Sequence, residues 1–368
     1  MSLLLEDSLA LEELFVEGYE RVIKIQDAKT GLVGIICIHD TTLGPTLGGT
    51  RIYPYASFDE ALFDVLRLAK GMTYKAAIAE CGLGGGKSVI ILDPARGKTP
   101  EMLAAFGKVV HSLQGLYTCA EDVGCNMDDV AMISRSTKYV TGLQHEKSSG
   151  NPSYFTAWGV YRGIQAALKK AYGTESVQDK TVAIQGVGSV GAILADLLFW
   201  NGAKLIITDV AKERAQKIAK QYGGVYCNPE DIWSVECDVF SPCALGGILN
   251  SATIPQLKCK VVAGAANNQL LTERDGDELM KKGIIYAPDY VINAGGLINV
   301  AEEVTVEGYS PEQSRKKTDR LFDQLTSIFD IAEQNECSSN RAANSLVEYR
   351  LKYKIGRRVE APCYHHAQ

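Results

Sequence analysis

The sequence lacks the features that mark several other classes of protein. No apolar run reaches the ~18 residues of a membrane span, because the most apolar stretch, 190–207, is interrupted by Asp196, Asn201 and Lys204. No basic block is present either: 38 Lys and Arg stand against 44 Asp and Glu, and the net charge of −6 disfavours general nucleic-acid binding. No cationic region precedes an apolar stretch at the N-terminus, so we expect no secretory signal.

Metal-binding and disulfide patterns are also missing. The ten cysteines include no CxxC pair, and the five histidines form neither an HExxH motif nor a cluster with cysteine. Reduced thiols in a cytoplasmic protein are the simplest interpretation of these cysteines. We therefore expect no metal site, no membrane association and no nucleic-acid partner.

The chain is long enough for about two domains. Its 368 residues, at roughly 150 per domain, are 46% hydrophobic and 22% charged, as in an ordinary globular protein. A polar, breaker-rich segment at 146–152 (EKSSGNP) marks the boundary that we expect between the two domains.

The spacing of apolar residues predicts an α/β protein. Strands are expected at 32–39, 88–92, 180–185, 204–208, 239–240, 261–263 and 284–286, and helices at 58–69, 100–113 (capped by Thr99), 156–171, 189–201, 321–332 and 341–354. Strands and helices alternate from 156 to about 300, which indicates parallel βαβ units. The last two helices are expected to fold back onto an earlier domain or a neighbouring subunit. Residues 1–17 suit a helix, and the tail beyond Gly356 is expected to be disordered.

A glycine-rich motif predicts a dinucleotide site. The residues of this GxGxxG motif are Gly186, Val187, Gly188, Ser189, Val190 and Gly191. The motif follows a predicted strand and opens a predicted helix, and Asp209 ends the next strand; these are the contexts that a Rossmann fold requires. A chance glycine turn is the alternative, since the chain has 35 glycines. Asp209 should accept hydrogen bonds from the ribose and repel a 2′-phosphate, which favours NAD over NADP, although Lys212 and Arg214 lie nearby.

A second group of residues suggests a lysine-based site. Lys75 lies twelve residues before Lys87, which follows three glycines. Burial beside a second ammonium group would favour a neutral lysine amine that acts as a base, whereas the alternative is a solvated lysine on a flexible turn. Asp122 is either a functional carboxylate or a turn residue. Amides at 267–269 and at Asn293 suit a nicotinamide carboxamide, so the patterns alone predict an NAD-linked oxidoreductase.

Nine segments in order resemble the glutamate/leucine/phenylalanine/valine dehydrogenase family, and most closely its leucine-oxidising members. These segments are HDTTLGPTLGGTR (39–51), LAKGMTYKAA (68–77), GGGKSVI (84–90), AEDVG (120–124), SGNPS (149–153), QGVGSVG (185–191), SPCALGG (241–247), AGAANNQL (263–270) and YAPDYVINAGGLINV (286–300). The resemblance implies an α/β protein with an N-terminal substrate-binding and catalytic domain (1–148), a Rossmann NAD-binding domain (149–325) and C-terminal helices returning to the first domain (326–368). It also implies an active-site cleft between the two domains and a homo-oligomer, often an octamer.

The resemblance assigns roles to individual residues. It implies that Lys75 pairs with the substrate α-carboxylate, that Lys87 is the catalytic lysine and that Asp122 relays protons at the amino group. Further residues with implied roles are Gly48 and Gly49 (backbone wall near the carboxylate), Asn268 (an amide reaching substrate or nicotinamide), and Ser153, Thr156 and Asn293 (cofactor side).

The implied reaction is reversible oxidative deamination of a branched-chain L-amino acid, with no metal. Neutral Lys87 would deprotonate the water that attacks the iminium carbon. Leu47, Ala120, Leu297 and Val300 would form an apolar side-chain pocket, which argues against glutamate as substrate. Leu297 stands where familiar leucine-oxidising members carry Val, so the same chemistry on phenylalanine or tryptophan remains an alternative. A catalytically silent NAD-binding protein is the alternative from another functional class.

Overall fold

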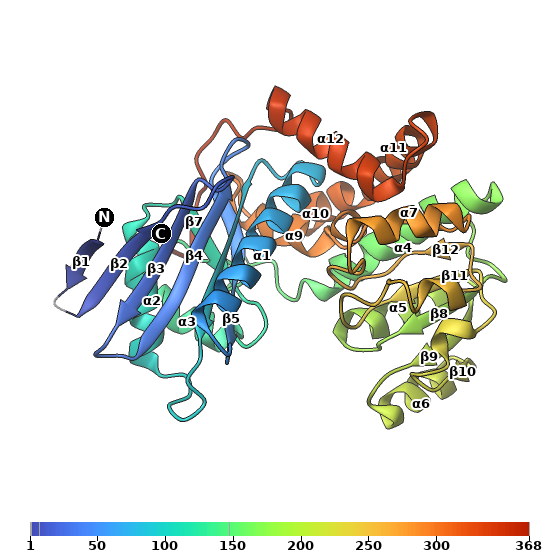
Figure 1. The fold of residues 1–368 in the computed structure, drawn as a ribbon, viewed down its shortest axis with the longest axis horizontal. Coiled ribbons are helices and arrows are strands. Elements are labelled where there is room, and N and C mark those ends of the chain that lie inside the picture. The colour runs from blue at the N-terminus through green and yellow to red at the C-terminus, as the bar shows by residue number, and fades with distance from the viewer. Residues whose placement is uncertain (1, 7, 147, 368) are drawn as a thin grey trace. The chain divides into compact units, whose positions relative to one another are not determined.

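The computed structural model describes residues 2–6, 8–146 and 148–367, and it folds as two compact units. The first unit comprises Met1–Gly150, Val300–Pro311 and Arg350–Gln368, and the second comprises Asn151–Asn299 and Glu312–Tyr349. Each unit is built on its own β-sheet (Figure 1). No helix in the described part of the chain is long and apolar enough to cross a membrane.

The first unit contains a mixed seven-stranded sheet. Its strands in spatial order are β1 (Ser2–Glu6), β2 (Leu9–Leu14), β3 (Arg21–Asp27), β4 (Leu32–Asp40), β6 (Gly84–Ile91), β5 (Thr46–Tyr53) and β7 (Tyr117–Ala120). Strands β1 to β4 and β6 pair antiparallel, whereas β5 runs parallel to both β6 and β7. The parallel part places the carboxyl ends of β5, β6 and β7 at one edge of the sheet.

Three helices accompany this sheet: α1 (Phe58–Ile78), α2 (Pro100–Ser112) and α3 (Met127–Ser134). Helix α1 packs on one face of the sheet. Its residues Ala61, Val65 and Ala69 form one hydrophobic cluster with sheet residues whose side chains point to that face: Val22, Ile35, Cys37 and Val89. Thr99 caps α2 through the backbone N–H of Met102, as predicted.

Strand β6 begins earlier than predicted. The sequence indicated a strand only from residue 88, after a glycine turn, but Gly84 already lies in the strand. A Cβ atom at Gly85 would lie 2.0 Å from the backbone nitrogen of Thr73 in α1, and one at Gly84 would lie 2.3 Å from the Asp40 carbonyl oxygen. The glycines therefore allow a helix and a strand to approach closely, and they place Lys87 inside a buried strand.

Two expectations about the chain ends are wrong. The described part of 1–17 forms strands, not a helix: β2 pairs with β3 along its whole length, so backbone hydrogen bonds outweigh the apolar spacing, and residues 1 and 7 lie outside the described part. The tail beyond Gly356 is ordered. Arg358 donates to the Val304 carbonyl at 2.9 Å, and the Tyr364 hydroxyl lies 2.6 Å from that of Thr118.

The second unit is a Rossmann-type domain, as predicted. Its sheet is parallel, in the order β10 (Val225–Tyr226), β9 (Lys204–Thr208), β8 (Thr181–Gln185), β11 (Val239–Pro242), β12 (Val261–Val262) and β13 (Ile285–Tyr286). Its helices include α4 (Ser153–Tyr172), α5 (Ser189–Trp200), α6 (Lys212–Gln221), α7 (Glu273–Lys281) and α8 (Asp289–Ile292). Buried Phe240, Val262 and Leu279 belong to its core.

The C-terminal helices divide differently from the predicted boundaries. Helix α9 (Gly295–Ala301) crosses from one unit to the other, and α10 (Pro311–Asp319), α11 (Leu321–Gln334) and α12 (Ser339–Tyr353) follow it. Helix α11 packs against α4, where Lys170 contacts Glu333 at 2.8 Å, so residues 326–349 belong to the second unit. Residues 300–311 belong to the first unit instead, together with everything from Arg350 onward.

Candidate active site

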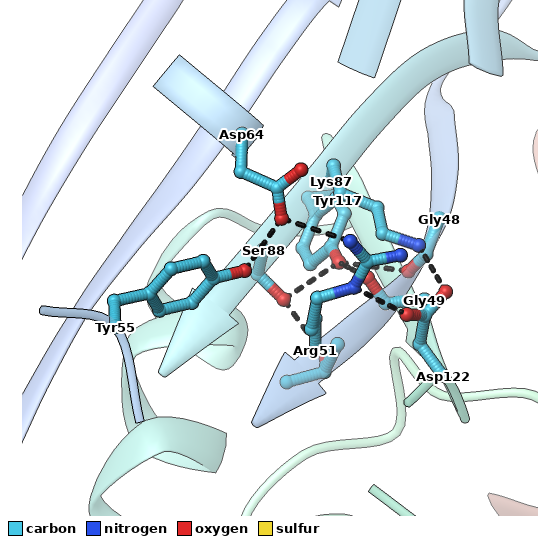
Figure 2. A network of polar contacts seen from close by, with 10 residues as sticks. Gly48, Gly49, Arg51, Tyr55, Asp64, Lys87, Ser88, Tyr117 and Asp122 are labelled. Atoms are coloured by element: carbon cyan, nitrogen blue, oxygen red, sulfur yellow. Dashed lines mark hydrogen bonds and ion pairs between the residues drawn. The ribbon is translucent and has the colours of Figure 1, made fainter. Parts of the chain in front are cut away.

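Lys87 and Asp122 meet in the first unit. Lys87 lies on β6 and is only 4% exposed, and Asp122 lies two residues beyond the end of β7. The Lys87 Nζ atom contacts Asp122 Oδ2 (Figure 2). The two residues that were expected to carry the chemistry are thus in direct contact, and the interpretation of Lys87 as a solvated lysine on a flexible turn is wrong.

A third charged residue, Arg51 of β5, completes this group. Its Nε donates to Asp122 Oδ1 at 3.0 Å, and its Nη1 donates to Asp64 Oδ2 of α1 at 2.8 Å. The Tyr55 hydroxyl donates to the same Asp64 oxygen at 2.6 Å (Figure 2). Burial and the hydrogen bond to Asp64 raise the pKa of Tyr55, so the phenol remains a donor.

The two cations keep Asp122 ionised. Burial alone would raise the pKa of the Asp122 carboxyl, but the charges of Lys87 and Arg51 and their hydrogen bonds outweigh burial and lower this pKa to about 2. A carboxylate with so low a pKa is a weak proton acceptor. In this state Asp122 acts as a counter-charge, and it becomes a better base only when one cation leaves it.

Gly48 and Gly49 lie where strand and loop approach each other. A Cβ atom at Gly48 would lie 1.8 Å from the Gly86 carbonyl oxygen, and one at Gly49 would lie 2.8 Å from the Cβ of Asp122. On the opposite face of the sheet, the Tyr117 hydroxyl donates to the Gly48 carbonyl at 2.7 Å and lies 2.9 Å from the Ser88 hydroxyl (Figure 2). Gly49 is therefore required by packing beside Asp122, and Gly48 by packing against the backbone of β6.

The remaining predicted residues of the first unit lie on the same or adjoining elements. Ala120 of β7 pairs with Gly49 of β5, and Leu47 lies two residues earlier on β5, so these residues share one face of the sheet. Lys75 lies in the last turn of α1, the helix that packs on β6. Val300 and Leu297 lie one turn apart on α9, but Leu297 is grouped with the second unit.

The glycine motif of the second unit forms the turn between β8 and α5. Gly186 has a φ of +96°, and a Cβ atom at Gly191 would lie 2.0 Å from the Gly186 carbonyl oxygen. A Cβ atom at Gly188 would meet nothing within 4 Å, so space remains above the loop. Ser189 and Val190 open α5, and the side chain of Val187 is buried beneath. This arrangement fits the pyrophosphate of a dinucleotide.

Asp209 supports this loop from the end of β9. Its Oδ2 accepts from the Val187 backbone N–H at 2.8 Å, and its Oδ1 accepts from the Ala211 N–H and from Arg214 Nη2, each at 2.8 Å. These hydrogen bonds and the charge of Arg214 outweigh burial and lower the pKa of Asp209. Asp209 is therefore an ionised carboxylate that fixes the glycine loop and carries an arginine as its partner.

Amide and hydroxyl groups lie near the start of α9. Asn293 Nδ2 donates to the Ala265 carbonyl at 3.0 Å and to Asn267 Oδ1 at 2.8 Å, while the buried Asn293 Oδ1 has no donor. A Cβ atom at Gly296 would lie 2.7 Å from Thr156 Oγ1, which places the first turn of α4 against this segment. The predicted residues Ser153, Thr156 and Asn293 thus belong to one region of the second unit. Asn268 is exposed and has a φ of +51°.

Comparison with known proteins decides the family. Residues 19–139 match the dimerisation domain of Glu/Leu/Phe/Val dehydrogenases, and residues 206–350 match the Glutamate/Leucine/Phenylalanine/Valine dehydrogenase model. Leucine dehydrogenase of Geobacillus stearothermophilus is 52% identical over 335 residues, which cover 91% of each chain. The chain belongs to this family.

Other members of the family are also similar. Phenylalanine dehydrogenase of Caldalkalibacillus thermarum is 46% identical over 345 residues, covering 92% of each chain. The crystal structure of L-tryptophan dehydrogenase from Nostoc punctiforme superposes with a TM-score of 0.81 at 43% identity, covering 91% of this chain and 96% of that one. The Glu/Leu/Phe/Val dehydrogenases are oxidoreductases that act on CH–NH₂ groups with a nicotinamide cofactor, so this chain is an amino acid dehydrogenase.

The sequence interpretation missed three residues of the group around Asp122, namely Arg51, Asp64 and Tyr55. Arg51 is the last residue of the family-like segment 39–51, but no role was predicted for it because residues 46–53 were not predicted as a strand. Alternate residues of a strand share a face, so recognising this strand would have placed Arg51 beside Gly49. Asp64 lies on α1, and only the packing of α1 against the sheet brings it to Arg51.

No group of three or more His, Cys, Asp or Glu side chains that could hold a metal ion occurs among the residues that the structure describes.

Proposed function

We propose that this chain catalyses the reversible, NAD-dependent oxidative deamination of a branched-chain L-amino acid, with leucine as the principal substrate and valine and isoleucine as further ones. The products are the 2-oxo acid, ammonia and NADH. The observation that carries this proposal is the contact of the buried Lys87 with Asp122, in a chain whose sequence is 52% identical to a leucine dehydrogenase.

The branched-chain preference follows from the residues expected around the substrate side chain. Leu47, Ala120, Leu297 and Val300 are all apolar and offer no cation to a side-chain carboxylate, which disfavours glutamate. An added methylene in such a pocket changes binding by only about 1–3 kcal/mol, so leucine, valine and isoleucine should all react. An aromatic substrate is the second candidate, favoured by the 43–46% identity to tryptophan and phenylalanine dehydrogenases.

The residues of the first unit have complementary tasks in the proposed reaction. Lys75 pairs with the substrate α-carboxylate. The substrate ammonium competes with Lys87 for Asp122 Oδ2, and release of Lys87 raises the basicity of Asp122 so that it can accept the amine proton. Once Lys87 has left Asp122 and lost its own ammonium proton to solvent, the neutral amine removes a proton from the water that attacks the iminium carbon. Gly48 and Gly49 let the strand pass close to these groups.

NAD, when bound, supplies the hydride acceptor for the substrate Cα. In the second unit, the N–H groups at the start of α5 would hold its pyrophosphate, and Asp209 would disfavour a 2′-phosphate. The buried, unsatisfied Asn293 Oδ1 is an acceptor suited to the NH₂ group of a carboxamide, with Ser153 and Thr156 on the same side. Asn268 is proposed to reach the substrate or the nicotinamide.

The assembly and location are proposed on separate grounds. The match of residues 19–139 to a dimerisation domain supports a homo-oligomer. We propose that this homo-oligomer is an octamer. A cytoplasmic location is proposed because the ten cysteines include no CxxC pair or disulfide framework in the sequence.

A substrate panel tests the proposal. Purified protein is mixed with NAD in alkaline buffer and with Leu, Val, Ile, Phe, Trp or Glu, and NADH formation is followed by its absorbance. Turnover with Leu, Val and Ile and little with Glu supports the proposal. Turnover with only Phe or Trp would retain the chemistry and overturn the apolar-pocket argument, and failure with all six despite NAD binding would overturn the function.

A further inference from the structure

We propose that Arg51 is a positioning residue for this reaction: held by Asp64, whose oxygen also accepts from Tyr55, it fixes one oxygen of Asp122 so that the other faces Lys87. The inference depends on the proposed function for the reaction that Arg51 serves, whereas the arrangement of these five side chains can be tested without turnover.

The two oxygens of Asp122 have different donors. Oδ1 accepts from Arg51 Nε at 3.0 Å, and Oδ2 contacts Lys87 Nζ. A carboxylate rotates about its Cβ–Cγ bond with little preference when it has a single donor. Two donors from neighbouring strands remove this freedom, so Arg51 sets the direction in which Oδ2 points (Figure 2).

The guanidinium group is itself held from a second element. Its Nη1 donates to Asp64 Oδ2 on α1 at 2.8 Å, and Tyr55 fills a further acceptor direction of that oxygen at 2.6 Å. The fork of an arginine can bridge two carboxylates, whereas the single nitrogen of a lysine is a point charge without this geometry. Arg51 therefore couples the position of α1 to the orientation of Asp122.

The local packing makes this contact possible. Gly49 lies two residues before Arg51 on the same face of β5, and a Cβ atom there would lie only 2.8 Å from the Asp122 Cβ. With glycine at that position, the Asp122 side chain lies over the strand within reach of Arg51. Arg51 and Asp122 are each mostly buried, so solvent screens their interaction less than that of a surface pair.

A purely structural tie between α1 and β5 is the alternative role for Arg51. This role needs the Asp64 contact but not the Asp122 contact, so replacing Asp64 should harm the protein as much as replacing Arg51. Under our proposal, Asp64→Asn loosens Arg51 but leaves its charge beside Asp122. The two substitutions should then differ in their effect on the protonation of Asp122.

The protonation of Asp122 can be measured without substrate. Infrared difference spectra report its protonated carboxyl band, which is assigned by its absence in Asp122→Asn. Charged and titratable groups that act on Asp122 or respond to its charge are Lys87, Arg51, Glu121, Cys125 and Tyr117. Among these groups, Arg51 can be tested by the substitution Arg51→Met, which removes its positive charge but keeps a long, apolar side chain.

We expect Arg51→Met to raise the pH at which Asp122 titrates by about one unit. It should also lower kcat by about tenfold or more, because misplacement of a catalytic group is costly, with the KM for NAD changed less than twofold. Asp64→Asn should leave the Asp122 titration close to that of the wild type and lower kcat by a smaller factor. Arg21→Met, which breaks the paired contact of Arg21 with Glu13 on the same sheet, serves as the matched control and should alter neither.

The outcomes separate the two roles. An unchanged Asp122 titration with kcat within threefold of wild type in Arg51→Met would overturn the proposal, as would equal effects of Asp64→Asn and Arg51→Met on titration and kcat. If Arg51→Met does not fold, Arg51→Lys carries the test: the titration should stay low because the charge is kept, while kcat falls because the fork is lost. A shifted titration in a protein without any turnover would support the arrangement and refute the proposed function separately.

Discussion

The ammonium group of Lys87 contacts the Oδ2 oxygen of Asp122, although the two residues lie 35 positions apart in the chain. Lys87 lies on β6 and Asp122 lies two residues beyond β7, and β5, which carries Gly48 and Gly49, lies between these strands. A Cβ atom at Gly49 would lie 2.8 Å from the Asp122 Cβ, and one at Gly48 would lie 1.8 Å from the carbonyl oxygen of Gly86, the residue before Lys87. The pairing of β5 with β6 and β7 therefore brings Lys87 and Asp122 together.

Gly49→Ala should separate the packing role of glycine from its backbone flexibility. The new Cβ would lie 2.5 Å from the Glu121 carbonyl and 2.8 Å from the Asp122 Cβ, so we expect a loss of about 1–3 kcal/mol in unfolding free energy and a large loss of activity. Gly71→Ala is the matched control: nothing lies within 4 Å of its Cβ in the helix α1, so it should stabilise by about 0.5–1 kcal/mol. Urea unfolding and initial rates measure both. Equal effects of the two substitutions would contradict the packing argument.

The low pKa of Asp122 links the stability of the first unit to pH. Since the pKa of Asp122 in the folded protein, about 2, lies below the usual aspartate value of 3.8, ionised Asp122 contributes stability above pH 4, and this contribution is lost as the pH falls towards 2. Asp122→Asn should therefore be less stable than wild type at pH 7, and the difference should shrink by about 1–2 kcal/mol below pH 4. Denaturant unfolding at fixed protein concentration across this range measures it. A difference independent of pH would mean that the carboxylate is not held ionised by its partners.

The Asp209–Arg214 pair should set the preference between NAD and NADP. Removing the arginine leaves the Asp209 carboxylate uncompensated, so Arg214→Ala should raise the ratio of kcat/KM for NAD to that for NADP by about tenfold, equivalent to ~1.4 kcal/mol. Asp209→Asn should lower this ratio. Lys204→Ala, an exposed change at the other end of β9, is the control and should leave it unchanged. A ratio that falls in Arg214→Ala would show that the arginine does not offset the carboxylate.

The C-terminal tail should stabilise the sheet that carries the site. Tyr364 is buried and its hydroxyl lies 2.6 Å from that of Thr118 on β7, so Tyr364→Phe should cost about 1 kcal/mol of unfolding free energy. Val359→Ser lies in the same tail but is fully exposed, and it should change stability by less than about 0.5 kcal/mol. Thermal or denaturant unfolding compares them. Identical stabilities for all three proteins would mean that the tail is not anchored through Tyr364.

Local signals in the sequence predicted much of this fold. The apolar run KLIIT predicted the strand β9, and Thr99 with Pro100 predicted the start of α2. The GxGxxG motif predicted the turn between β8 and α5. These features depend on neighbouring residues alone. The roles expected for Lys87 and Asp122 came instead from the family resemblance, and their contact joins residues 35 positions apart.

Features that depend on long-range packing could not be predicted in this way. The glycines before Lys87 predicted a turn, because nothing in the sequence shows that α1 packs so closely on the strand at Gly85 that a Cβ atom would not fit there. Residues 9–14 carry helical spacing but pair with β3, and the tail is ordered because Arg358 and Tyr364 find partners far away in the chain. The role of Arg51 was not predicted for the same reason, because Asp64 and Asp122 contact it only in the folded protein.

The most direct test of the account compares NADH formation from L-leucine by the wild-type protein, Lys87→Met and Lys98→Met. Lys98 also pairs with an aspartate of the first unit, Asp129, and is the matched control. We predict that Lys87→Met lowers kcat by about 10²–10⁴-fold with NAD affinity unchanged, and that Lys98→Met stays within twofold of wild type. Comparable turnover by Lys87→Met would contradict the central claim that this buried lysine carries the chemistry.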